Sequence, residues 1–455
     1  MHPSPASQPE QPSDLLTARA GAHRPSGLFD KPGVRKFVRN RAGVVALIVI
    51  AAFVLVAALI ALPTRMLSMD DVQSRVAPSG LPGLGMASGP AARTEIADFF
   101  VREVEKALRA SEPDAALADL RFAERVIAPL PVGEVRGAVA DARAAFARLD
   151  AALLAYEDAQ IEAEELAEGG GSAADAELLG ERLGAARDRY RDSLRGLEAH
   201  VERLFPRPEG WRRVVYGLRL FAGTDRQGRS IAFRAIYSVK TAVQIGMVTA
   251  VFSVFIGAVL GGAAGFFGGL VDHAVVWLYS TLSSIPYIIW LVVIAFVFRE
   301  SDWTVPITGK PIAQTLIPVY LAFGVTLWVG TCRVIRGEAM KIKGLDYIQS
   351  ALATGCSPAR ILGRHVLPNV LYLVFINFSL AFVAAIKGEV ILSYLGLGVQ
   401  GQPSWGIMIR DSKDDVVLGV FWELGAATLM MFVLVYAFNI LSDALQDAFD
   451  PKHVG

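Results

Sequence analysis

The segment from Asp346 to Pro368 has residue types and spacing that predict a binding surface for a partner. It is polar and basic, and it lies between two long apolar runs. Gly355 favours the left-handed conformation that ends a helix, while Ser357 can cap a following helix with Pro358 at its first position. Pro368 is expected to close the unit, because proline disfavours helical geometry in the preceding residue. The segment therefore predicts two short helices with a bend between them.

The second short helix is predicted to be amphipathic. Its apolar side is formed by Ile361, Leu362 and Val366, and its basic side by Arg360, Arg364 and His365. The bent segment Asp346–Pro368, called the elbow below, lies between membrane spans and can bind a partner protein on its basic side. The alternative is a re-entrant helix that lies on the membrane surface without a partner.

The sequence carries no recognisable catalytic motif, so we do not expect an enzyme. It lacks a G-x-x-x-x-G-K-[ST] phosphate loop, an H-E-x-x-H pair and a G-x-S-x-G elbow, and its six histidines are scattered. An ion-coupled carrier would normally place carboxylates in the middle of its spans, and the apolar runs have none. Energy for uphill transport is therefore expected from a partner.

The composition indicates a membrane protein with several spans. Hydrophobic residues make up 53% of the 455 residues, and the mean hydropathy is +0.43. The net charge of zero implies no nucleic-acid partner. With only two cysteines, Cys332 and Cys356, a disulfide framework is not expected.

Six uncharged apolar runs have about the length of 20 residues or more that is needed to cross a bilayer. They are Val44–Leu62, Thr241–Leu270, Ala274–Phe298, Pro311–Cys332, Val366–Ile386 and Leu424–Ser442. Basic residues before the first run (Lys31, Arg35, Lys36, Arg39 and Arg41) predict a cytoplasmic N-terminus. Six spans then place both termini and the elbow in the cytoplasm. A second basic cluster agrees: Arg333, Arg336, Lys341, Lys343, Arg360 and Arg364.

Residues 63–220 are predicted to form a helical insert outside the membrane. Apolar side chains alternate at steps of three and four, the spacing of a coiled-coil seam, on both sides of the Gly-Gly-Gly-Ser break at 169–172. The pattern predicts an antiparallel helical hairpin with shorter helices from 92–127 packed against it. The hairpin is interpreted either as a spacer or as a docking surface for another protein.

Three features in or beside the apolar runs bear on packing and membrane depth. Gly257, Gly261 and Gly265 leave one helix face bare, which favours close packing within this chain or against a second subunit. Lys387 and Glu389 are expected either in the translocation path or at the membrane interface. Trp405 fits an interfacial anchor.

The elbow resembles the EAA loop of bacterial ABC importer permeases. In that loop Glu-Ala-Ala is followed by three residues, a glycine, nine residues, an apolar residue or histidine, and x-Leu-Pro. Gly355, His365, Leu367 and Pro368 fall on this spacing. The chain is most similar to the second membrane subunit of the dipeptide, oligopeptide and nickel permeases. The resemblance covers residues 31–62 and 221–455.

Further motifs support the resemblance, and three positions depart from it. The matching residues outside the elbow are Gly223, Thr224, Asp225, Gly228, Arg229, Glu389, Gly396, Gly398, Trp405, Asp450 and Pro451. Gln349 and Ser350, followed by Ala351, stand where the family has Glu-Ala, which puts one salt bridge to the ATPase in doubt. Ser230 replaces an aspartate that usually follows the arginine at 229, and the insert is longer than the family leads us to expect.

The resemblance implies an all-α, MetI-like permease fold with six transmembrane helices in the bacterial inner membrane. The implied parts are a cytoplasmic tail (1–43), a first span (44–62), the external insert (63–220) and a permease core (221–455) with its coupling loop (335–368). Implied partners are a homologous permease subunit, two ABC ATPases, an external substrate-binding protein and the lipid bilayer. No cofactor is expected on this chain, since ATP and Mg would be used by the ATPases.

The resemblance also implies that the elbow couples this chain to the ATPases. The implied coupling residues are Gln349, Ser350, Ala351, Gly355, Ser357, Arg360, Arg364, His365, Leu367 and Pro368. Two other classes of function remain possible from the sequence: a membrane-anchored sensor or scaffold that works through the external hairpin, and an ion-coupled carrier. The sequence does not name the substrate, which could be a peptide, a nickel chelate or another small solute.

Overall fold

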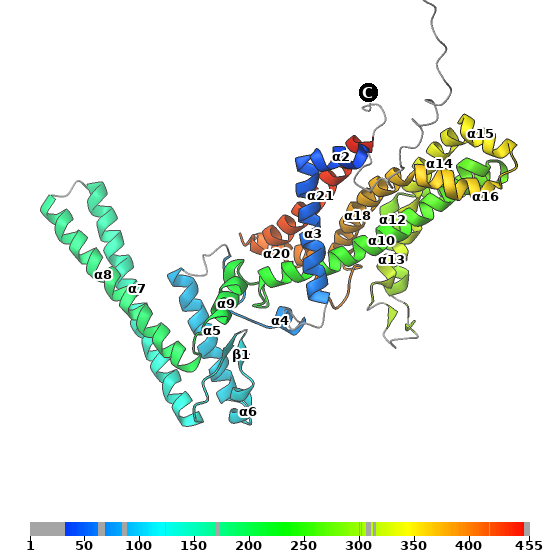
Figure 1. Ribbon diagram of the computed structural model, residues 1–455. Coiled ribbons are helices and arrows are strands. Elements are labelled where there is room, and N and C mark those ends of the chain that lie inside the picture. Colours follow the sequence, from blue (N-terminus) through cyan, green and yellow to red (C-terminus); the bar gives the residue numbers. More distant parts are fainter. Residues whose placement is uncertain are drawn as a thin grey trace, which may run out of the picture.

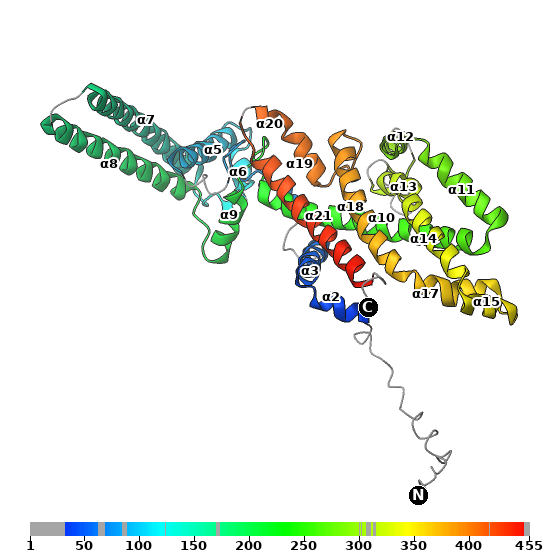
Figure 2. The same cartoon turned by 90° about the horizontal axis from the view of Figure 1, so that it is seen from above.

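The computed structural model describes residues 32–61, 69–83, 89–122, 124–169, 173–299, 301, 303–305, 311–312, 315–417 and 419–449. Helices dominate this part of the chain (Figure 1). Its β-structure consists of a short antiparallel hairpin, β1 (Arg121–Phe122) and β2 (Arg125–Val126), together with isolated bridges. The helical core and the hairpin insert lie at opposite ends of the molecule in both ribbon views (Figures 1 and 2).

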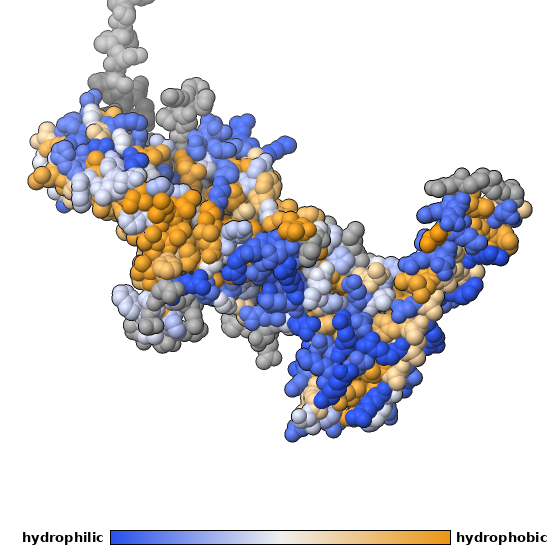
Figure 3. Space-filling view, turned by 180° about the vertical axis from the view of Figure 1, so that it is seen from behind, coloured by the Kyte–Doolittle hydropathy of each residue, from blue (hydrophilic) through white to orange (hydrophobic). Residues whose placement is uncertain are grey.

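Five helical stretches among the described residues are long and apolar enough to cross a membrane. They are α3 (Arg41–Ala61), α10 (Ile231–Phe267), α13 with α14 (Ile317–Thr326 and Trp328–Lys343), α18 (Leu371–Tyr394) and α21 (Trp422–Phe449). A broad apolar surface covers this part of the molecule (Figure 3). The chain is therefore a multi-pass membrane protein by the length and composition of its helices.

The third predicted span is not one straight helix. The structure divides it into α11 (Gly269–Ser283) and α12 (Tyr287–Arg299), which are bent by 81° relative to each other. Pro286 lies in the break and cannot donate the backbone hydrogen bond that would continue the helix. The second predicted span also differs, because α10 begins at Ile231 rather than at Thr241.

Helix α10 is the element around which the other spans pack. It contacts α3, α13, α14, α18 and α21, and α3 packs beside α21. The short α2 (Pro32–Arg39) lies against α21, so the two described ends of the chain lie at the same end of the core (Figures 1 and 2). The basic segment before α3 and the end of α21 therefore share one side.

The bare glycine face of α10 packs within this chain, against α14. A methyl group added at Gly257 would lie 2.7 Å from the Trp328 carbonyl oxygen, and one at Gly261 would lie 2.5 Å from that of Cys332. At Gly265 the corresponding atom is again a backbone oxygen, 2.4 Å away. The two helices therefore approach until backbone meets backbone, which only glycine permits. Of the two interpretations of these glycines, packing within the subunit is correct.

The insert contains the helical hairpin whose seam the sequence predicts. Helices α7 (Val132–Gly169) and α8 (Ala173–Leu204) pack along each other and extend away from the core (Figures 1 and 2). At the base they meet α5 (Pro90–Leu108) and α6 (Pro113–Ala118). Residues 121–122 and 125–126 pair as the strands β1 and β2, where the sequence predicts helix.

The base of the insert is held by a cluster of aromatic side chains. Phe99, Phe100, Phe122 and Phe205 make ring contacts with centroid separations of 4.8–5.7 Å. Each of these four side chains is almost fully buried. The cluster joins α5, β1 and the end of α8, so the hairpin has its own hydrophobic core at this end.

Backbone hydrogen bonds attach the insert to the helical core. After α4 (Met69–Gln73), residues 75–83 run beside residues 223–229, with Val76 donating to the Gly228 carbonyl at 2.7 Å and Thr224 to that of Leu81 at 3.1 Å. Helix α9 (Trp211–Phe221) returns the chain to α10. Residues 75–83 thus belong structurally with the core, although the predicted insert includes them.

We expect Gly261→Ala to destabilise the protein, because the new methyl group must displace the α14 backbone. Overpacking of this kind typically costs about 1–3 kcal/mol. The thermal unfolding midpoint of the detergent-solubilised protein should fall. Gly330→Ala is the matched control, since a methyl group there meets no atom within 4 Å. A midpoint unchanged in Gly261→Ala would contradict the close α10–α14 contact.

Candidate functional site

The elbow has the bend that its sequence predicts. Helix α15 (Asp346–Ala353) ends before Gly355, which has a φ of +84°, and Ser357 precedes α16 (Pro358–Ile361). A π-helix, η4 (Leu362–Val366), and the turn α17 (Leu367–Asn369) continue the second arm. Pro368 does not close the unit as predicted. The wider π-turn before it accommodates a residue without an N–H, and the chain stays helical until Val370.

Apolar contacts fix the inner side of the elbow to α10 and α14. Ile348, Ile361 and Val366 are buried and pack in one cluster with residues of those two helices. Leu367 lies against Gly262 of α10. These contacts confirm the predicted apolar side, and they mean that a displacement of the elbow must also displace α10 and α14.

The outer side of the elbow is exposed and basic. Arg360, Arg364 and His365 are all exposed. His365 packs edge-on against Tyr347, whose hydroxyl accepts a hydrogen bond from Asn369 at 2.9 Å, so the two arms are braced against each other. The elbow thus presents cationic side chains on a rigid support.

The remaining elbow positions are also accessible. Gln349, Ser350, Gly355, Ser357 and Pro368 are exposed, whereas Ala351 and Leu367 are half-buried. The Gln349 amide donates to the Lys343 carbonyl at 2.6 Å. This side chain therefore turns back onto the end of α14.

A second set of motif residues forms a turn beside the start of α10. Gly223 and Gly228 have φ values of +79° and +74°, and a methyl group at either would lie 2.3 Å from a backbone oxygen of residues 77–81. The Thr224 hydroxyl donates to the Pro78 carbonyl and accepts from the Leu81 amide. Asp225 accepts hydrogen bonds from the backbone N–H groups of residues 227 and 229. The turn therefore has a fixed shape, with the Asp225 carboxylate inside it.

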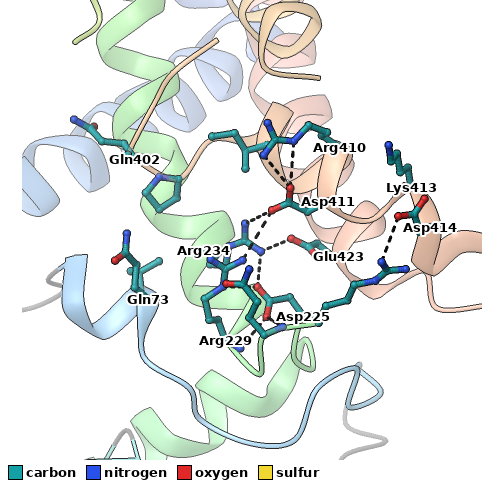
Figure 4. Close-up of a pocket in the computed structure, with 16 residues that line it drawn as sticks. Gln73, Asp225, Arg229, Arg234, Gln402, Arg410, Asp411, Lys413, Asp414 and Glu423 are labelled. Carbon is teal, nitrogen blue, oxygen red and sulfur yellow. Dashed lines mark hydrogen bonds and ion pairs between the residues drawn. The ribbon is translucent and has the colours of Figure 1, made fainter. Parts of the chain in front are cut away.

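Asp225 belongs to a buried ion cluster that the sequence did not reveal (Figure 4). Its carboxylate lies 2.6 Å from both Arg229 and Arg234. Arg234 also pairs with Asp411 at 3.3 Å and with Glu423. Arg234, Asp225 and Glu423 are each no more than 3% exposed. One arginine thus joins α10 to α19 (Trp405–Asp411) and α21.

The ion cluster forms one wall of a cavity of about 540 Å³. Charges of both signs line it: Asp225, Asp411, Asp414, Glu423, Arg226, Arg229, Arg234, Arg410 and Lys413. At its edge Arg226 donates a hydrogen bond to Asp415 of α20 (Lys413–Val417), and this bond raises the pKa of the Arg226 guanidinium. Among the described residues, no group of three or more His, Cys, Asp or Glu side chains could hold a metal ion.

Trp405, predicted as an interfacial anchor, and Glu389, expected in the translocation path or at the interface, are both buried within the chain. Trp405 is 1% exposed, and its indole N–H donates to the Ala235 carbonyl of α10 at 2.9 Å. Glu389 is 2% exposed and accepts a hydrogen bond from Ser393 at 2.6 Å. Neighbouring segments cover both side chains. Their position in the sequence, after the end of an apolar run, did not indicate this burial. Lys387 is exposed.

The other motif residues have local structural roles or lie outside the described residues. Gly396 has a φ of +78°, and its carbonyl accepts a hydrogen bond from Arg299. A methyl group at Gly398 would lie 2.0 Å from the Ser393 hydroxyl. Asp450 and Pro451 fall outside the described part of the chain.

Sequence comparison assigns the family. Residues 253–454 match the model of the binding-protein-dependent transport system inner membrane component. The dipeptide transport system permease protein DppC of Bacillus subtilis (strain 168) is 32% identical over 231 residues, which are 50% of this chain and 68% of that protein. The chain belongs to this family. It is the transmembrane permease subunit of an ABC importer.

Two further relatives have the same extent of similarity. The permease is 30% identical to the oligopeptide transport system permease protein OppC of Escherichia coli (strain K12) over 234 residues, 51% of this chain and 72% of that protein. It is 30% identical to the glutathione transport system permease protein GsiD of Pectobacterium atrosepticum over 231 residues, 50% and 72% of the two chains. Each alignment covers about half of the permease.

We expect Arg234→Ala to destabilise the permease strongly, because three carboxylates would lose their shared cation. Removing one partner of a buried ion pair typically costs about 3–5 kcal/mol. Arg226→Ala is the control, because its side chain is 47% exposed and water screens its ion pairs. Thermal unfolding midpoints of both variants in detergent measure the difference. Equal midpoints would show that the ion cluster contributes little to stability.

Proposed function

We propose that this permease moves peptides or similar small solutes into the cytoplasm, powered by two ABC ATPases that bind the elbow. The relatives that carry dipeptide, oligopeptide or glutathione transport in their names support this class of substrate. The remaining partners in the proposal are a homologous permease subunit and an external substrate-binding protein. In this proposal ATP and Mg are bound and used by the ATPases and not by this chain.

The observation that carries the proposal is the rigid, exposed basic elbow. Its Arg360, Arg364 and His365 side chains are accessible, while its inner side is packed on α10 and α14. A partner that closes on the outer side would therefore displace two spans together. This supports an alternating-access mechanism, in which the ATPases favour one of two arrangements of the spans.

The proposed topology has six spans with both termini in the cytoplasm. It counts the bent pair α11–α12 as one span, and it places the elbow inside and the insert outside. The positions of α2, the end of α21 and the elbow support it, since all three lie toward the same side of the core (Figure 1). The basic residues of α2 and of the elbow then follow the positive-inside rule.

Gly355→Pro and Arg364→Glu should uncouple ATP hydrolysis from transport. Proline cannot adopt the φ of +84° at the bend, and the charge reversal opposes any acidic surface on the ATPase. In proteoliposomes with the ATPases, stimulation of hydrolysis by loaded binding protein should fall about tenfold. Arg39→Glu, on the exposed side of α2, is the control and should keep its stimulation. Normal stimulation in both elbow variants would contradict the proposed role.

Cysteine labelling tests the topology directly. Cys356 is exposed in the elbow and Cys332 is buried, so the wild-type chain has one reactive thiol among its two cysteines. A membrane-impermeant maleimide should label Cys356 only after the cells are permeabilised. A Cys332→Ala, Cys356→Ala, Ala151→Cys variant, with its thiol on exposed α7, should be labelled from outside. Labelling of Cys356 in intact cells would overturn the proposed orientation.

A further inference from the structure

A second cavity lies at the base of the insert and is lined by residues of α5, β2, α8 and α9. Its volume is about 420 Å³. Arg93 and Ile96 of α5, Arg125 of β2, Glu198 and Glu202 of α8, and Tyr216 of α9 contribute to its walls. The cavity is separate from the ion cluster of the helical core, and none of its lining residues belongs to the permease motifs.

Arg125 is the unusual group in this cavity. Its side chain is buried, with 5% exposed, and its guanidinium lies 5.0 Å from the ring centroid of Phe100 and 5.2 Å from that of Tyr216. Its Nε atom has no hydrogen-bond partner, and the Glu202 and Glu198 carboxylates attract the guanidinium without forming an ion pair with it. Burial lowers the pKa of this guanidinium. A buried charge without a counter-ion is costly, and a bound anion would offset that cost.

The carboxylates that line the cavity already have partners. Glu198 pairs with Arg93 at 3.3 Å and with Arg207 at 3.1 Å, and Glu202 pairs with Arg207. Arg213, exposed at the rim, has no carboxylate partner among the described residues. The lining therefore contains four arginines against two glutamates, and Arg125 and Arg213 remain available to an anion.

Apolar side chains form the rest of the cavity wall. Ile96, Ala97, Val201 and Leu220 lie beside the arginines. A site with a few cationic groups and an apolar wall suits a ligand that has a charged end and an apolar body. The planar guanidinium matches the two oxygens of a carboxylate, with which it can form two parallel hydrogen bonds.

We propose that this cavity binds a small organic carboxylate. Its carboxylate pairs with Arg125 and Arg213, and its apolar part packs against Ile96 and Val201. The site belongs to the insert and is distinct from the translocation function of the spans. It does not depend on which substrate the permease moves.

Calorimetric titration of the full chain in lipid nanodiscs tests the proposal. The probes are N-acetyl-L-leucine, which has a carboxylate and an apolar side chain, and N-acetyl-L-leucinamide, which has the same shape without the charge. The acid should bind saturably, and the amide should bind about tenfold more weakly or worse, because it loses the charge-assisted hydrogen bonds. Equal affinities, or no saturable binding of the acid, would overturn the proposal.

Three variants locate the site. Arg125→Lys keeps the charge but loses the two parallel N–H donors of the guanidinium, so we expect about a tenfold loss of affinity for the acid. Arg213→Gln at the exposed rim should also weaken binding of the acid. If the Arg125 variant does not fold, this variant alone shows whether the acid binds in the cavity. Arg212→Gln removes the same charge from an exposed position that does not line the cavity, and it should bind as the wild type does. Equal affinities of the Arg213 and Arg212 variants would place the anion elsewhere.

A further experiment tests whether the cavity binds an acidic side chain of a partner protein instead of a small molecule. The purified substrate-binding protein of the same transport system is added without the acetylated amino acid. If Arg213→Gln abolishes the binding of that protein while N-acetyl-L-leucine does not bind the wild type, the occupant is an acidic side chain of the partner and the proposal is wrong. If N-acetyl-L-leucine binds the wild type with the same affinity in a separate titration with that protein present, the result supports a separate small-molecule site.

Discussion

The backbone contact between α10 and α14 is the constraint on which the permease core depends. Gly257, Gly261 and Gly265 of α10 bring the two helices into backbone contact, so neither helix can rotate without separating the pair. Helix α10 has 37 residues and spans about 55 Å at 1.5 Å per residue. Its start carries Arg234 of the ion cluster, and its end carries Phe266 of the elbow cluster. One rigid element therefore connects the two sites.

The ion cluster holds the start of α10 in a single arrangement. Arg234 pairs with carboxylates from the Asp225 turn, α19 and α21, and each pair also restricts the position of the other two. Buried ion pairs add little stability over apolar packing, but an incomplete set is costly, so the cluster strongly disfavours other arrangements of these helices. The span formed by α11 and α12 is different, because the 81° bend interrupts its helix.

Local chemistry explains why the elbow and the hairpin could be predicted from the sequence. The bend at Gly355 depends only on its neighbours, and the hairpin seam repeats every three or four residues. The ion cluster could not be predicted in this way, because Arg234, Asp411 and Glu423 are far apart in sequence and each looks like a charge flanking a span. The burial of Trp405 was missed for the same reason: it depends on a long-range hydrogen bond to α10.

Arg234 and Arg125 show how differently two buried arginines can be used. Arg234 has carboxylates on several sides, so its charge is neutralised within the chain and its role is to fix helices. Arg125 lies against the faces of two aromatic rings, which are weaker partners for a cation than a carboxylate is, and Glu202 and Glu198 attract it without forming an ion pair. Its charge is therefore only partly balanced by the fold itself. Since the cavity beside it also contains Arg213, the missing partner is best explained by an anion that comes from outside the chain.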